Sequence, residues 1–190
     1  MGMIWQDVIS NAQVYGLEES IRRAKYPMAI DAARPTDELT DGIKKLAQSN
    51  KGEGHDQWLT GVIVQFDLTF TVKAWTEAER YHFLDFISSQ STMHRITKFD
   101  LDTAYINYVD PRIIEIMKEK VEEYNKEPAP INYLKILYSN PCGMKLTAGM
   151  TTNYRQLKTI YAQRKTHRLP EWCAFCEWIE TLPMSELITG

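Results

Sequence analysis

Side chains that could bind an anion are concentrated in one short stretch of the chain. The stretch is Ser88-Ser89-Gln90-Ser91-Thr92-Met93-His94-Arg95, and its candidates for phosphate binding are Ser89, Ser91, His94 and Arg95. A phosphate can be held where a helix stops and leaves backbone groups free beside such side chains. Serine and threonine are also common at helix ends merely to satisfy backbone groups, so both interpretations stay open.

A second group of polar residues flanks a predicted strand. The loop Glu53-Gly54-His55-Asp56 comes just before that strand, and Arg80-Tyr81-His82 lies early in the helix expected after it. Both segments are rich in polar residues, some of which could bind phosphate.

A third segment, from Asn153 to Arg164, could present polar groups on a helix. At 100° per residue its eleven steps come to about 1100°, within about 20° of a whole number of turns. Asn153 and Arg164 would therefore share one stripe, with Arg155 on the opposite side. An arginine whose stem lies along apolar surface, or one that pairs with a glutamate, would explain the same pattern.

These segments resemble the flavin-dependent thymidylate synthases, which methylate deoxyuridylate using FAD, NADPH and methylene-tetrahydrofolate. That family has a glycine-histidine loop before a core strand, then Arg-His-Arg, seven residues and Ser. Much later come Asn-x-Arg-x-Leu and a further Arg eleven residues after the Asn. The corresponding residues here are Gly54-His55, Arg80-Tyr81-His82, Ser91, Asn153-Tyr154-Arg155-Gln156-Leu157 and Arg164. The resemblance covers about residues 53–95 and 150–172.

The chain departs from the family pattern at several positions. Tyr81 and His82 replace the central His and the second Arg, and Ser91 follows after eight residues instead of seven. The phosphate-binding Arg of the family falls on Met93, so that His94 or Arg95 would have to take its place. Lys135 is a loose counterpart of another family arginine. These departures leave open whether catalysis survives.

The resemblance implies a role for each matched residue. Ser89, Ser91, His94, Arg95 and Lys135 would bind a pyrimidine deoxynucleotide. Arg164 would contribute to the same site and act in catalysis by polarising the pyrimidine ring through a charge-assisted hydrogen bond. The residues expected to line FAD are His55, Arg80, His82, Asn153 and Arg155.

The resemblance also bears on partners. The family places its sites between subunits, so we expect a homo-oligomer. Five tryptophans and ten tyrosines also favour an interface, and the terminal helix with Trp172, Phe175, Trp178 and Ile179 is the expected contributor. The chain is similar to uncharacterised phage and prophage proteins of Gram-positive bacteria that share Ser-Thr-Met-His and the pattern from Trp172 to Pro183. The altered motif positions favour an alternative function, a non-catalytic phage-encoded binding protein of the same fold that acts on a host protein or sequesters a nucleotide.

Other patterns predict the elements that position these residues. Alternating apolar side chains predict a strand over 62–71 with one buried face. Helices are predicted over about 17–25, 75–87, 131–138, 152–167 and 170–182. Thr76 and Glu79 would form the capping box of the second of these. Two more helices are predicted, one with Thr36 as its cap and one that begins after Asp110-Pro111. Together with the resemblance, they predict an α+β fold in which a mixed sheet packs against long helices.

Composition is that of a globular protein with one domain over residues 1–190. Apolar residues make up 44% of the chain and aromatic residues 11%, which excludes a disordered class. Twenty-two Lys and Arg against twenty-five Asp and Glu give a net charge of −3, too balanced for a protein that mainly neutralises nucleic-acid backbones. Apolar runs are too short for a membrane span, so we expect no membrane contact and a cytoplasmic location.

Three cysteines, Cys142, Cys173 and Cys176, are too few for a disulfide framework, and we expect them to be reduced. The Cys173-x-x-Cys176 spacing also fits a zinc or redox motif. A structural zinc site needs four ligands in recognisable pairs, however, and only one pair is present. We therefore expect ordinary core cysteines and no metal.

Overall fold

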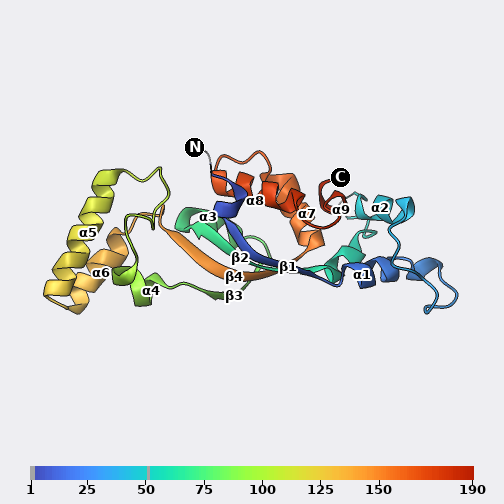
Figure 1. Cartoon of the computed structure of the whole chain (residues 1–190), viewed down its shortest axis with the longest axis horizontal. Coiled ribbons are helices and arrows are strands. Elements are labelled where there is room, and N and C mark those ends of the chain that lie inside the picture. The colour runs from blue at the N-terminus through green and yellow to red at the C-terminus, as the bar shows by residue number, and fades with distance from the viewer. Residues whose placement is uncertain (1–2, 51) are drawn as a thin grey trace. The chain divides into compact units, whose positions relative to one another are not determined.

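A computed structural model describes residues 3–50 and 52–190 of the chain. Four strands form one sheet in the order β1-β2-β4-β3, with bounds Ile9–Tyr15 for β1, Ile63–Thr71 for β2, Asp85–Ser89 for β3 and Lys145–Asn153 for β4 (Figure 1). The α+β class expected from the sequence is confirmed. The sheet is antiparallel, however, and not mixed as expected.

The described chain gathers into two compact units. The first unit comprises Met1–Leu68, Tyr81–Ile87 and Gly149–Gly190, and the second comprises Thr69–Arg80 and Ser88–Ala148. The first holds α1 (Leu17–Ala24), α2 (Asp41–Ala47), α7 (Tyr154–Arg164), α8 (Pro170–Glu180), α9 (Glu186–Thr189) and the 3-10 helices η1 (Trp5–Asp7), η2 (Tyr26–Met28) and η3 (Gln57–Gly61). The second holds α3 (Val72–Ala78), α4 (Thr92–Arg95), η4 (Ile96–Lys98), α5 (Pro111–Lys126) and α6 (Pro130–Ser139). A single domain over 1–190 stays a prediction.

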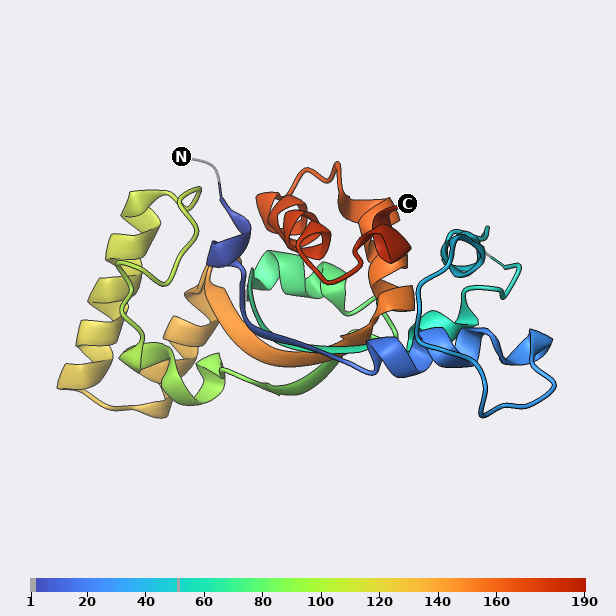
Figure 2. The ribbon, with the colours of Figure 1, turned by 45° about the vertical axis from the view of Figure 1, so that its right-hand side comes forward.

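In the first unit, α8 packs on strand β2 through aromatic rings. The ring of Phe66 lies 4.7 Å from that of Trp178 and 5.9 Å from that of Phe175. Figure 2 shows α8 beside α7, with which it packs. Trp172, Phe175, Trp178 and Ile179 are all buried. The expectation that these residues contribute to an interface is therefore wrong, because they fill the core of their own unit.

The turn between β1 and α1 requires glycine. Gly16 has φ +74°, in the left-handed region, and a Cβ atom there would lie 2.7 Å from the carbonyl oxygen of Gly61. Any other residue would strain the backbone and collide with that carbonyl. The turn lets α1 begin at Leu17, as the sequence predicts.

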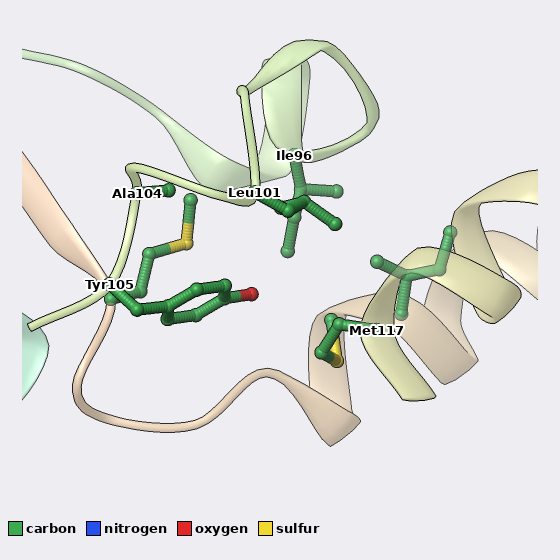
Figure 3. Close-up of a cluster of buried hydrophobic side chains, with 7 residues drawn as sticks. Ile96, Leu101, Ala104, Tyr105 and Met117 are labelled. Carbon is green, nitrogen blue, oxygen red and sulfur yellow. The ribbon is translucent and has the colours of Figure 1, made fainter. Parts of the chain in front are cut away.

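The second unit has its own apolar core. Its labelled members are Ile96, Leu101, Ala104, Tyr105 and Met117 (Figure 3). The predicted inner face of α5 packs here, since Met117 is fully buried and Ile114, Val121 and Tyr124 lie against the cluster. The predicted start of α5 is also confirmed: the Asp110 carboxylate accepts from the backbone N–H of Arg112 at 2.9 Å, and Pro111 is the first helical residue.

The helix predicted over 75–87 is wrong at both ends. Thr71 caps α3 by accepting from the N–H of Ala74 at 3.2 Å, whereas Thr76 bonds the carbonyl of Lys73 inside the helix. The helix ends at Ala78, and the chain then forms edge strand β3. Ser88 and Ser89 therefore lie on a strand and not at the end of a long helix.

Two other helix starts also differ from the prediction. Helix α2 begins at Asp41 with Thr40 as its cap, so Thr36 does not cap it. The helix expected from residue 152 begins at Tyr154, because the preceding residues belong to strand β4. Within the described residues, no helix combines the length and apolarity needed to cross a membrane.

Candidate functional site

A pocket of about 690 Å³ lies in the first unit beside the start of α7. Its lining residues are Gly52, Asp56, Gln57, Thr60, Phe83, Asn153, Arg155, Gln156, Lys158, Thr159, Ala162 and Gln163. The volume is in the range of about 300 to 1,000 Å³ that is usual for small-molecule sites. Two cations and one carboxylate stand among otherwise neutral lining residues, so the net charge favours an anionic ligand.

Asn153 is placed at the junction of strand β4 and helix α7. It has extended backbone angles, φ −138° and ψ 165°, and its Oδ1 accepts from the N–H of Gln156 at 2.9 Å. The predicted helical stripe from Asn153 to Arg164 is therefore wrong, since Asn153 is a cap outside the helix. Asn153 and Arg155 also line the same pocket and do not serve opposite faces.

Arg155 is held at the pocket by residues about a hundred positions away in sequence. Its Nε donates to Asp56 Oδ1 at 3.0 Å and its Nη1 to Gln57 Oε1 at 2.6 Å. The Asp56 side chain is only 9% exposed, so the ion pair is largely shielded from water. Among the described residues no partner accepts from Arg155 Nη2, which leaves that donor for a ligand.

Lys158 bonds the same carboxylate from the next turn of α7. Its Nζ donates to Asp56 Oδ2 at 3.0 Å and to the carbonyl oxygens of Ala47 at 2.6 Å and Ser49 at 3.0 Å. Asp56 thus bridges two cations with its two oxygens. Sequence reasoning missed Lys158 as a site residue, although its position three residues after Arg155 puts both on one side of a helix.

Arg164 is surrounded by aromatic and polar groups of the first unit. Its Nε donates to Tyr81 Oη at 2.7 Å, and its Nη1 lies 2.8 Å from His167 Nε2. Its guanidinium carbon stands 4.8 Å from the ring centre of Trp172 and 5.5 Å from that of Tyr81. Such cation–π geometry stabilises a guanidinium that is partly removed from water.

The three residues of the Arg80-Tyr81-His82 segment differ in burial and in their surroundings. Tyr81 is buried, and its hydroxyl donates to Gln163 Oε1 at 3.0 Å, next to the pocket lining. His82 is exposed, with its ring 6.2 Å from that of Phe83, which lines the pocket. Arg80 is exposed in the second unit, and His55 is exposed in the loop beside Asp56. Of the five residues expected to line a flavin, Asn153 and Arg155 line the pocket.

The candidates for phosphate binding lie in the second unit. Ser89 is exposed on strand β3, Ser91 precedes α4, and His94 and Arg95 are exposed in the last turn of α4. These four residues remain close together in sequence and are accessible to a ligand.

Lys135 is less well placed for this cluster. Its Nζ donates to Asn132 Oδ1 at 3.3 Å within α6, while Tyr133 of the same helix donates to the carbonyl of Met93 in α4. Two residues along a helix are about 200° apart, so Lys135 is on the side of α6 turned away from that contact.

The cysteines differ in burial. Cys176 is buried, and burial raises the pKa of its thiol to about 12, so the thiol stays protonated at neutral pH. Cys173 is half-buried and its Sγ donates to the carbonyl of His167 at 3.1 Å. Cys142 is exposed. The three are free thiols, as expected.

Comparison with known proteins identifies the class of fold. No protein-family model and no curated protein matches the sequence. Solved structures do match, and the chain has the fold of the flavin-dependent thymidylate synthases, as the sequence motifs led us to expect.

Three solved structures illustrate the likeness. A flavin-dependent thymidylate synthase from Helicobacter pylori, complexed with FAD and dUMP, has a TM-score of 0.68 at 14% identity, covering 93% of this chain and 94% of that one. A second structure of that enzyme with FAD and dUMP has a TM-score of 0.68 at 13% identity, covering 96% and 95%. A UMP/dUMP methylase from Streptomyces cacaoi, bound with 5-Br dUMP, has a TM-score of 0.65 at 16% identity, covering 92% and 87%.

Proposed function

We propose that this chain is a divergent relative of the flavin-dependent thymidylate synthases that binds FAD and a pyrimidine deoxynucleotide, with deoxyuridylate as the substrate to be methylated. The observation that carries the proposal is the pocket lined by Asn153 and Arg155. It occurs in a fold that matches, over more than nine tenths of both chains, a structure complexed with FAD and dUMP. Fold likeness alone does not fix function, so the proposal rests on the residues that line the pocket.

The pocket residues fit the chemistry of a flavin nucleotide. Among the described residues, Arg155 Nη2 and Asn153 Nδ2 have no acceptor within the protein, and both belong to side chains of the lining. Phosphate oxygens and ring carbonyls are acceptors, and charge-assisted hydrogen bonds from arginine favour them. A bound flavin would supply the redox chemistry, while these residues would bind and orient it.

The phosphate of the nucleotide would be bound by the exposed cluster of the second unit. We propose that Ser91 and Arg95, with Ser89 and His94, hold this phosphate, and we leave out Lys135 because it is on the side of α6 turned away from them. For Arg164, in the first unit, we propose a separate role, which is to polarise a pyrimidine ring. A guanidinium that lies over the rings of Tyr81 and Trp172 and is held in one orientation is suited to that task.

Ligand binding is tested by thermal denaturation with saturating FAD, dUMP or both. A ligand that binds the folded state stabilises it by RT ln(1 + [L]/Kd), about 2.7 kcal/mol at a hundredfold excess over Kd. We expect a rise in Tm with each ligand and yellow colour in protein purified from cells. UTP at the same concentration and ionic strength controls for non-specific anion effects. Colourless protein whose Tm moves with neither FAD nor dUMP would exclude the proposal.

A second candidate, a binding protein without turnover, is favoured by the contacts of Tyr81. Tyr81 stands where the family motif has its central histidine, and its hydroxyl accepts from Arg164. A group tied to the proposed catalytic arginine in this way would compete with substrate for it. The two candidates are separated by incubating FAD-loaded protein with dUMP, NADPH and methylene-tetrahydrofolate and measuring thymidylate.

We also propose that copies of the chain associate through helices α5 and α6 of the second unit. Apolar side chains are exposed on α6 at helical spacing, namely Ile131 at 60%, Leu134 at 41% and Tyr138 at 88%, and α5 adds Ile113 and Ile116. The two helices pack side by side in Figure 1. Exposed apolar stripes of this kind mark interaction surfaces.

Assembly is checked by light scattering coupled to size exclusion. We expect the wild-type protein to exceed the mass of one chain at micromolar concentration, and Leu134→Lys to shift it toward the monomer because a charge cannot be buried without a partner. Glu122→Lys, which changes an exposed charge on α5, serves as the control. A wild-type monomer would refute the association.

A further inference from the structure

The ammonium group of Lys158 has all of its hydrogen-bonding capacity engaged. An ammonium carries three N–H donors and no acceptor. Lys158 directs one donor to each of three oxygens, those of the Ala47 carbonyl, the Ser49 carbonyl and the Asp56 carboxylate, at 2.6 to 3.0 Å. The side chain is 20% exposed. Lys158 therefore lines the pocket but has no donor left for a ligand.

The three acceptors lie at the two ends of one loop, residues 47–57. Ala47 is the last residue of α2 and Ser49 follows it, whereas Asp56 immediately precedes η3. Lys158 thus joins both ends of the loop to α7. The loop also contributes Gly52, Asp56 and Gln57 to the pocket lining, so its placement determines one wall of the pocket.

The middle of the loop is closed by a turn of its own. Asn50 donates from its backbone N–H to Glu53 Oε2 at 3.1 Å and from its Nδ2 to Glu53 Oε1 at 3.0 Å, while the N–H of Glu53 donates to the Asn50 carbonyl at 3.2 Å. These bonds lower the pKa of Glu53 and keep it ionised. These bonds are internal to the turn, whereas Lys158 and Arg155 of α7 form hydrogen bonds with the two ends of the loop. Residue 51 lies outside the described part of the chain.

We propose that Lys158 is a positioning residue that clamps the 47–57 loop against α7 and thereby forms the wall of the pocket, without a hydrogen bond to the ligand. Through Asp56 the same clamp fixes the orientation of Arg155, whose Nε bonds the other carboxylate oxygen. The identity of the ligand rests on the function proposed above. The clamp itself rests on the contacts of Lys158.

Hydrogen exchange measured by mass spectrometry tests the clamp in the ligand-free protein. The loop amides of Gln48, Ser49, Asn50, Glu53 and Gln57 all donate to acceptors at 3.1 to 3.3 Å, so they exchange when the loop opens. In Lys158→Met we expect the loop to exchange about tenfold faster or more, since each lost bond involves a charged donor. Lys158→Gln keeps two donors and should give an intermediate rate.

Fluorescence titration with FAD gives the second measurement. We expect the FAD dissociation constant to rise about tenfold in Lys158→Met, with less effect in Lys158→Gln. Lys165→Met is the matched control, because Lys165 is exposed just beyond the same helix and its Nζ faces the Tyr161 ring at 5.3 Å. It should change neither the loop exchange nor the affinity.

The outcomes separate the clamp from the cofactor. Loop exchange that stays at the wild-type rate in both Lys158 variants overturns the clamp, and so does faster exchange spread evenly over α7 and α8, which would indicate general destabilisation. Faster loop exchange with unchanged FAD affinity overturns the role in the pocket. A wild-type protein that binds no FAD would refute the proposed cofactor, and the exchange comparison would then decide the clamp on its own. Should Lys158→Met fail to fold, Lys158→Gln carries the same test.

Discussion

Replacing Trp172 with alanine is expected to lower the free energy of unfolding by about 3 to 5 kcal/mol, as is usual for a large aromatic side chain in a core. Trp172 is fully buried, with its ring 5.7 Å from that of Tyr81 and 5.8 Å from that of Phe175. It also supplies the face over which the Arg164 guanidinium lies at 4.8 Å. The substitution therefore removes buried area, aromatic contacts and a cation–π contact together.

Urea denaturation followed by circular dichroism measures this loss. Tyr108→Ala removes an aromatic side chain that is 77% exposed, and it should change the free energy of unfolding by no more than about 0.5 kcal/mol. Trp172→Phe, which keeps a ring, should fall between the two. A loss below about 1 kcal/mol in Trp172→Ala would be incompatible with the packing of α8 described above.

The second prediction separates the roles of the two arginines. Arg155→Ala should weaken FAD binding by about ten- to a hundredfold, because a hydrogen bond from a charged group contributes about 1.5 to 3 kcal/mol. The loss of affinity should be larger because the substitution also removes one of the two cations that pair with the largely buried Asp56 carboxylate. Only Lys158 would then remain as its charged partner. Arg164→Ala should mainly weaken dUMP binding, since Arg164 does not line the pocket that holds Arg155.

Calorimetric titration of both ligands into both variants provides the measurement. Arg168→Ala, at an exposed arginine four residues beyond Arg164, is the control and should leave both affinities within about twofold. Arg164→Lys keeps a charge but cannot reproduce the planar contact with Trp172, so it should bind dUMP less well than wild type. Effects below about fivefold on both ligands, in variants that remain folded, would assign both arginines to structural ion pairs or packing alone.

Several elements could be read from the sequence because their signals are local. In strand β2, buried residues alternate with exposed or half-buried ones as far as Phe70, and Val64, Phe66, Leu68 and Phe70 are at most 3% exposed. The start of helix α5 could be predicted from its acidic cap, Asp110, followed by Pro111. Both residues favour the helix through interactions within its first turn. The motif spacing from Asn153 to Arg164 likewise pointed to the fold that the solved structures share.

Strands β1 and β3, at the two edges of the sheet, could not be recognised in the same way. Every residue of β3 is exposed, so its sequence has no alternating pattern of burial that would predict a strand. It forms a strand because it pairs with β4 at the edge of the sheet. The register of β1 shifts between Ser10 and Gln13, which breaks the period of two. Edge strands are decided by backbone pairing with a neighbour, and side-chain pattern carries little of that information.

The sequence by itself determined the fold class, the buried strand, helix α5 and the polar segments that carry Asn153, Arg155 and Arg164. Only the tertiary structure decided which of these residues meet. Asp56 lies 99 residues before Arg155 and 102 before Lys158, yet it bonds both. Arg164 bonds Tyr81 across 83 residues. The spacing of residues along one helix fixes their relative directions, but a pocket assembled from a loop, a strand end and a helix depends on contacts that no local pattern encodes.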